Sequence, residues 1–266
     1  MWSVNVIIIK SHGMWVLQLV SLITYLGECY ILLKDVLGMI YMDFTVDVEE
    51  VISLPKGRLV FSRINDSMIR IVFNGDLQIP PKTVGVSRNS SISLRPIPPS
   101  GNLLKVDYLF IKLNEPVTVL PKESVEIYFK LPVDIGVYVN NYLIHTVPTV
   151  KVKYALYGPP DLGHLCRYVD GGLINSVPDN LLGITKLVIN NQSSDVGTVG
   201  KVVAPLNGLQ IYLTASNDLI FNTIYVRLAD SLHAEVTTKL IPSKHVENLK
   251  YLFKGIESAY VMKYGV

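Results

Sequence analysis

The 266-residue chain has little cysteine, little charge and nearly equal numbers of basic and acidic side chains. Its two cysteines are too few for a disulfide framework, and the absence of a CxxC pair excludes zinc ribbons and thioredoxin-like redox sites. Its 24 basic and 22 acidic side chains lack the basic surplus of a duplex-binding protein, so no nucleic-acid partner is expected. With 49% apolar residues the chain is able to bury a sizeable core, which excludes a disordered protein.

The sequence also lacks the short motifs that mark common catalytic sites. It contains no HExxH zinc motif, no GxSxG nucleophile elbow, no GxGxxG dinucleotide loop and no EF-hand loop. The segment Gly197–Lys201 is too short for a phosphate-binding loop, and Val202 stands where that loop needs Ser or Thr. We therefore expect no metal and no cofactor, and a non-catalytic binding or assembly module is favoured over an enzyme.

An apolar leader, residues 1–42, differs from the rest of the chain in composition. It contains only four charged side chains and none of the fifteen prolines. Residues 11–27 carry no formal charge, but this run is slightly short for a membrane span, which needs about 20 apolar residues. Residues 14–33 are predicted to be helical and to pack little against the body, because their apolar character is not confined to one stripe.

Two interpretations of the leader are open. In the favoured one, translation starts at Met42 and the protein is cytoplasmic. In the other, residues 11–27 anchor a membrane-associated accessory protein, so membrane association is expected only if the leader is genuine. No small-residue cleavage site follows the apolar run, which disfavours a secretory signal, and a buried core helix is the least favoured alternative.

After Met42 the hydrophobic pattern has a period of two, which is typical of β-strands. In residues 149–154 the alternation predicts that Lys151 and Lys153 face water, while Val150, Val152 and Tyr154 face the core. Further β-branched and aromatic runs recur at short spacing in residues 58–63, 68–73, 106–113, 125–131, 135–139, 184–190, 201–204, 209–215, 219–228 and 235–240. Gaps this short leave no room for helical crossovers, so an antiparallel sandwich or barrel is predicted.

We expect a mainly β fold with two antiparallel β-sandwich or barrel-like units. Residues 43–157 are predicted to form the first unit and residues 183–242 the second. Residues 158–182, with three prolines and four glycines, interrupt the alternating pattern and are predicted to form a junction between the two units. Residues 243–266 are predicted to form an amphipathic helix docked on a sheet, because apolar side chains follow Ser243 at three- and four-residue steps.

The densest group of reactive side chains lies at the junction and forms the candidate binding site, composed of Tyr157, Asp161, His164, Cys166 and Arg167. Arg167 offers a planar fork for a carboxylate or phosphate, and His164 changes protonation near neutral pH. The expected partner is therefore a small anionic ligand or a protein. Two alternatives stay open. One is an enzyme with its site at this junction. The other is a structural connection between the two units, in which Arg167 donates its hydrogen bonds to nearby carboxylates or carbonyls.

Four sequence blocks resemble the archaeal domain of unknown function family 432. They are KYALYG in residues 153–158, G-x-x-CRY in residues 163–168, LPVDIGVYV in residues 131–139 and PVTVLPKES in residues 116–124. The resemblance covers the chain from about residue 42 onward and excludes the leader. It implies an uncharacterised archaeal protein with no assigned substrate, cofactor or catalytic residue. It also implies, as an alternative, an accessory protein of a small-conductance mechanosensitive channel.

Overall fold

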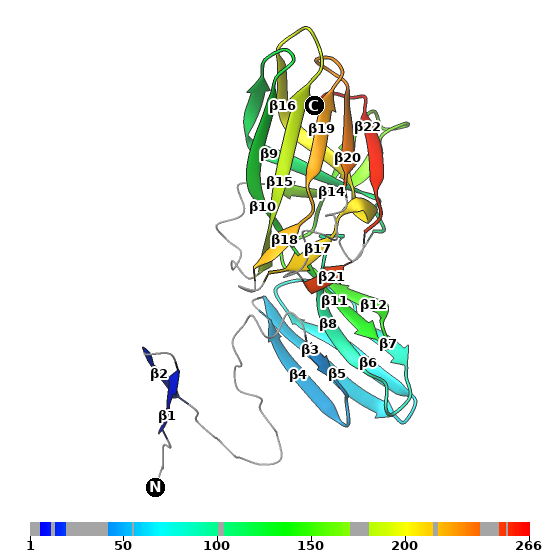
Figure 1. Cartoon of the computed structure of the whole chain (residues 1–266). Coiled ribbons are helices and arrows are strands. Elements are labelled where there is room, and N and C mark those ends of the chain that lie inside the picture. The colour runs from blue at the N-terminus through cyan, green and yellow to red at the C-terminus, as the bar shows by residue number, and fades with distance from the viewer. Residues whose placement is uncertain are drawn as a thin grey trace. The chain divides into compact units, whose positions relative to one another are not determined.

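The computed structural model describes residues 6–11, 14–19, 42–54, 56–100, 104–170, 181–214, 218–239, 250–253 and 255–266. The chain divides into an N-terminal unit, residues 1–34, and a main unit, residues 35–266 (Figure 1). The described part of the chain contains no helix with the length and apolar character needed to cross a membrane.

The N-terminal unit contains an antiparallel hairpin of β1 (Val6–Ser11) and β2 (Met14–Leu19). The predicted helix over residues 14–33 is therefore wrong at residues 14–19, and its remainder lies outside the described residues. The run Val6-Ile7-Ile8-Ile9 explains the hairpin, because β-branched side chains favour strands over helices.

The first half of the main unit is built from two four-stranded sheets. One sheet has the order β4 (Glu49–Leu54), β5 (Gly57–Asn65), β6 (Met68–Gly75), β7 (Lys82–Gly85). The other has the order β12 (Tyr142–Val147), β11 (Asp134–Val139), β8 (Ile92–Ile97), β3 (Met42–Phe44). One hydrophobic cluster draws on both sheets, with Leu59 and Phe61 from β5 and Leu94 and Val137 from β8 and β11.

The second half of the main unit has a four-stranded sheet and an eight-stranded sheet. The smaller sheet has the order β13 (Lys153–Tyr157), β14 (His164–Asp170), β9 (Tyr108–Val119), β16 (Gly197–Pro205). The larger contains β10 (Ser124–Pro132), β15 (Leu182–Asn191), β17 (Ile211–Leu213), β18 (Leu219–Phe221), β19 (Ile224–Leu228), β20 (Ala234–Thr238), β21 (Lys250–Phe253) and β22 (Ser258–Met262). A second hydrophobic cluster joins these two sheets.

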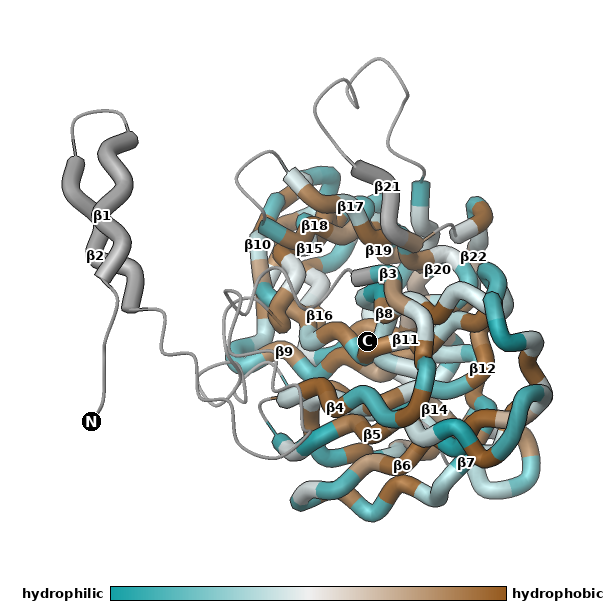
Figure 2. Tube along the Cα trace, turned by 90° about the horizontal axis from the view of Figure 1, so that it is seen from below, coloured by the Kyte–Doolittle hydropathy of each residue, from teal (hydrophilic) through white to brown (hydrophobic). Residues whose placement is uncertain are grey.

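Alternation of burial along single strands explains why these segments form half-buried sheets. In β15, Leu187 and Ile189 are fully buried, while Val188 between them is partly exposed. Figure 2 shows apolar segments along β8, β11 and β16, where most side chains are buried. The prediction of a mainly β fold is confirmed, and no sheet of the described residues closes on itself as a barrel.

The prediction of purely antiparallel sheets is only partly right. Strand β14 runs parallel to β9, and β15 runs parallel to both β18 and β19. The chain between β9 and β14 passes through β10 to β13, so strands rather than helices separate these parallel neighbours. Short gaps between strands exclude helical crossovers but do not exclude connections of this kind.

Strand pairing also differs from the expected linear division into domains. Strands β9 and β10, within residues 43–157, pair with β14, β15 and β16 in the second half. Strand β14, within the expected junction at residues 158–182, lies between β13 and β9. Alternation shows which side of a strand is buried but not which strand it pairs with, and this explains the difference.

The predicted C-terminal helix over residues 243–266 is wrong where the structure describes it, because β21 and β22 lie there; residues 241–249 lie outside the described residues. A Cβ added at Gly255 would lie 2.6 Å from the carbonyl oxygen of Leu209, so the backbones approach as only glycine allows. Glycine in a helix interior costs about 1 kcal/mol, whereas pairing of β22 with β20 buries Met262 completely.

Candidate functional site

The five residues predicted to form a site lie on the hairpin of β13 and β14. Tyr157 ends β13 directly opposite His164, and Cys166 and Arg167 follow in β14, which is extended as expected. Asp161 is exposed in the turn between the strands. Because side chains alternate along a strand, Arg167 points to the face opposite His164 and Cys166. The structure therefore brings Tyr157, His164 and Cys166 together and separates Arg167 from them.

Tyr157 and Cys166 are both buried within the hydrophobic cluster of the second half. The Tyr157 hydroxyl donates a hydrogen bond to the carbonyl oxygen of Gly265 at 2.9 Å. The Cys166 thiol donates to the carbonyl oxygen of His164 at 3.3 Å, and burial raises its pKa to about 11. At neutral pH this residue is a protonated thiol, which is a poor nucleophile.

Arg167 is completely buried. Its Nη1 donates to the carbonyl oxygens of Lys151 at 3.4 Å and Lys153 at 3.2 Å, whereas Nε and Nη2 form no hydrogen bond with any described residue. Burial lowers the pKa of Arg167, and the charge of buried Asp134 partly offsets this. Because its side chain has no exposed surface, a ligand in solution does not touch it in this conformation.

His164 lies on an exposed part of β14 beside two tyrosines. Its ring centroid is 4.9 Å from that of Tyr108 and 5.5 Å from that of Tyr260. Burial, followed by the neighbouring ring of Tyr157, raises the pKa of Tyr260, so this phenol stays protonated at neutral pH. The described residues contain no group of three His, Cys, Asp or Glu side chains arranged to hold a metal ion.

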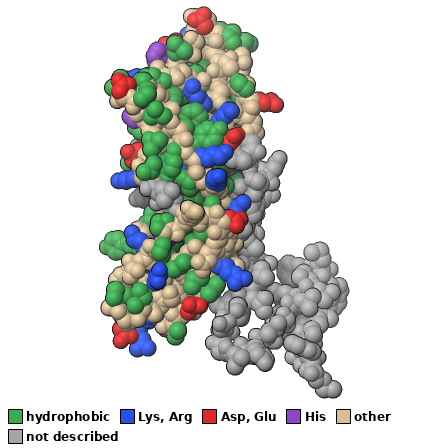
Figure 3. Space-filling model, turned by 180° about the vertical axis from the view of Figure 1, so that it is seen from behind, with side chains coloured by type: hydrophobic (Ala, Val, Ile, Leu, Met, Phe, Trp, Pro, Cys, Tyr) green, Lys and Arg blue, Asp and Glu red, His purple; other side chains and the backbone are tan. Residues whose placement is uncertain are grey.

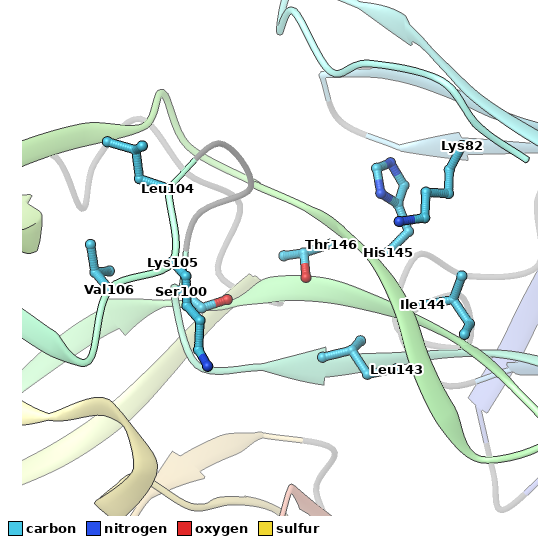
Figure 4. Close-up of a pocket in the computed structure, with 9 residues that line it drawn as sticks. All are labelled: Lys82, Ser100, Leu104, Lys105, Val106, Leu143, Ile144, His145 and Thr146. Atoms are coloured by element: carbon cyan, nitrogen blue, oxygen red, sulfur yellow. The ribbon is translucent and has the colours of Figure 1, made fainter.

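A groove that was not predicted from the sequence lies at one edge of the first half. It has a volume of about 340 Å³ and combines residues of β7, β12 and the connection between β8 and β9. Its lining consists of Lys82, Ser100, Leu104, Lys105, Val106, Leu143, Ile144, His145 and Thr146 (Figure 4). Both β7 and β12 are edge strands of their sheets, so the groove opens where the two sheets end.

The groove carries positive charge without a neutralising partner in its lining. Lys82 and Lys105 are exposed, and neither forms an ion pair with any residue that the structure describes. The lining contains no Asp or Glu. An ammonium group in this position gains more from an anionic ligand than one that already has a carboxylate beside it.

His145 adds an uncharged polar group to the groove. Its Nε2 is buried and has no hydrogen-bond partner among the described residues. Burial lowers the pKa of the imidazole, and the nearby charge of Lys82 lowers it further. The ring is therefore neutral at pH 7, and Figure 4 shows it beside Lys82.

Two hydroxyl groups complete the polar lining. In Figure 4, Ser100 and Thr146 direct their oxygens toward the space between the β8–β9 connection and β12. A hydroxyl is able to donate or accept a hydrogen bond, so this part of the groove suits a ligand atom that is a hydrogen-bond donor or one that is an acceptor. The sequence offered no signal for this site, because its polar residues come from three distant segments and match no motif.

Residues 40–262 match the family model described as "Protein of unknown function (DUF432)". The chain belongs to this family. The match confirms the resemblance inferred from the sequence blocks, and it includes every residue of the groove and of the β13–β14 hairpin. No curated protein and no solved structure matches the chain.

Proposed function

We propose that this DUF432 chain is a non-catalytic binding module whose ligand occupies the groove between β7 and β12. One observation carries the proposal: polar side chains from three segments converge on a groove of about 340 Å³ without partners of their own among the described residues. Ligand sites in proteins have volumes of roughly 300 to 1,000 Å³ and combine apolar walls with a few convergent polar groups. The groove has both properties.

The chemistry of the lining supports binding rather than catalysis. Nucleophilic catalysis needs a hydroxyl or thiol within hydrogen-bond reach of a base. The only imidazole of the lining is His145, and in the described structure no hydrogen bond joins its Nε2 to Ser100 or Thr146. The lining also lacks the carboxylate pair that glycoside hydrolysis uses.

A second cavity of the main unit is an alternative ligand site. It has a volume of about 200 Å³ and lies between β9 and β10, lined mostly by apolar side chains such as Ile111, Ile127 and Phe129. Lys112 and Glu115 bring opposite charges to its lining. This cavity is smaller and offers fewer convergent polar groups, so the groove between β7 and β12 is the better candidate.

The test is a screen of small molecules against the ¹⁵N-labelled full chain by two-dimensional NMR. The collection contains neutral, cationic and anionic compounds of similar size. We expect at least one class to shift the backbone amides of Lys105 and Thr146 in a saturable manner. A Thr146→Trp variant, which fills the groove, should lose this response, whereas Leu232→Trp at a distant exposed position should keep it. Saturable binding that leaves both amides unchanged would overturn the proposal.

A further inference from the structure

The two lysines of the groove lie at its opposite ends. Figure 4 shows Lys82 beside His145 at one end and Lys105 beside Ser100 at the other, with Thr146 between them. The lysines come from β7 and from the β8–β9 connection, so the positive charges of the groove form two separate centres. One compact anion does not lie next to both centres in this arrangement.

The middle of the groove is less polar than its ends. Between the two charged ends, Figure 4 shows the Leu143 side chain and the Thr146 hydroxyl. Leu143 is 46% exposed, and a ligand that covers it gains from burial of apolar surface. The groove is thus positive at both ends and mixed in character at its centre.

We infer that the ligand is a small dianion with one acidic group at each end of a short, partly apolar linker. One acidic group accepts hydrogen bonds from Lys82 and the other from Lys105, while Thr146 lies against the linker. Such charge-assisted hydrogen bonds are stronger than neutral ones. The inference rests on the proposed binding function of the groove and adds the chemical class of its ligand.

Other occupants fit the lining less well. A cation meets two ammonium groups and no carboxylate. A neutral molecule of the same length as the dianion fills the groove but leaves both ammonium groups without an anionic partner. A monoanion satisfies only one end. The dianion is therefore the class that satisfies the largest number of polar groups in the lining.

The experiment measures the affinity of length-matched probes for the full chain by isothermal titration calorimetry. The probes are the dicarboxylates from succinate to suberate, adipamide as the neutral analogue of adipate, hexane-1,6-diamine as the cationic analogue, hexanoate as the monoanion and hexane-1,6-diol bisphosphate as the phosphate analogue. We expect one chain length to bind best, with adipamide and hexanoate at least about tenfold weaker than the dianion of the same length. Comparison of adipate with the bisphosphate then identifies the acidic group.

Single variants test the two ends separately. Lys82→Met and Lys105→Met should each weaken the best dianion by about tenfold, because each removes one charge-assisted contact. Lys151→Met, at an exposed lysine outside the groove, is the matched control and should bind normally. Circular dichroism confirms that each variant is folded.

The outcomes distinguish this inference from the proposed function. If neutral or cationic probes shift the Thr146 amide and bind as tightly as dianions, the groove binds ligands but the dianion inference is overturned. The dianion inference is also overturned if neither lysine variant weakens dianion binding. If no probe and no compound of the wider collection perturbs the groove, the proposed function fails as well.

Discussion

The phenol oxygen of Tyr157 accepts a hydrogen bond from the backbone N–H of Tyr264 at 3.0 Å. Gly158, which directly follows β13, has a φ of +107°, and a Cβ there would lie 2.5 Å from the Tyr264 ring. The end of β13 therefore fits closely against the last residues of the chain. In this structure the Tyr157 hydroxyl binds the C-terminal backbone through hydrogen bonds. This is a structural role for a residue that was predicted from the sequence to line a binding site.

Replacing Tyr157 by Phe should lower the free energy of unfolding by about 1 to 2 kcal/mol. The substitution keeps the ring but removes two hydrogen bonds to backbone groups, each worth about 1 kcal/mol. Urea unfolding measures the change. Tyr142→Phe, at a tyrosine that is 75% exposed, should change stability by less than about 0.5 kcal/mol. If both variants had the same free energy of unfolding, the structural role of the Tyr157 hydroxyl would be refuted.

Replacing Arg167 by Ala should lower stability by about 2 to 5 kcal/mol, because it removes a positive charge near buried Asp134 and the donor of two hydrogen bonds to backbone carbonyls. The exposed Arg88→Ala is the control. A fully stable Arg167→Ala protein that loses ligand binding would instead support the site predicted from the sequence at Tyr157, Asp161, His164, Cys166 and Arg167. Urea unfolding and calorimetry together separate the two results.

Strand positions are the part of the fold that the sequence predicts well. Lys151 and Lys153 are exposed as expected, and the apolar side chains at Val150, Val152 and Tyr154 are partly buried. Their exposure follows from local alternation and the high free-energy cost of burying an ammonium group. Local rules of this kind act over a few residues and need no knowledge of the tertiary fold.

Properties that depend on distant segments were not predictable. Nothing near Gly255 in the sequence shows that the Leu209 carbonyl approaches it, so the three- and four-residue spacing falsely indicated a helix. The groove is a similar case, since Lys82, Ser100 and His145 line one groove only because two sheet edges and a connection converge. Site prediction favoured Arg167 because it lies in a dense local cluster, whereas the open polar groove is assembled from separated residues.

Removing residues 1–41 should leave a protein that unfolds cooperatively with the stability of the full chain. The main unit is compact by itself, and the family match begins at residue 40. Thermal and urea unfolding of the shortened chain measure this, and the NMR screen shows whether the groove still binds. Aggregation, or unfolding without a transition, would show that the leader belongs to the fold.

The stability of the protein should decrease as the pH falls below about 6.5, the unperturbed pKa of histidine. Burial and the charge of Lys82 lower the pKa of His145 in the folded state, so the unfolded chain binds this proton more readily. His145 contributes its full stabilisation at pH values above its pKa in the unfolded state. This contribution is lost as the pH falls from the pKa of the unfolded state to the lower pKa of the folded state. His145→Gln should flatten the profile of unfolding free energy between pH 7.5 and 5.5, because it removes the group whose pKa differs between the folded and unfolded states.

The most direct test of the central claim is a crystal structure of the full chain with the best-binding dianion from the calorimetric series. We predict ligand density between β7 and β12, with one acidic group within hydrogen-bond distance of Lys82 Nζ and the other within hydrogen-bond distance of Lys105 Nζ. The linker should lie against Thr146. Density beside His164 and Tyr108, with the groove between β7 and β12 empty, would contradict the account.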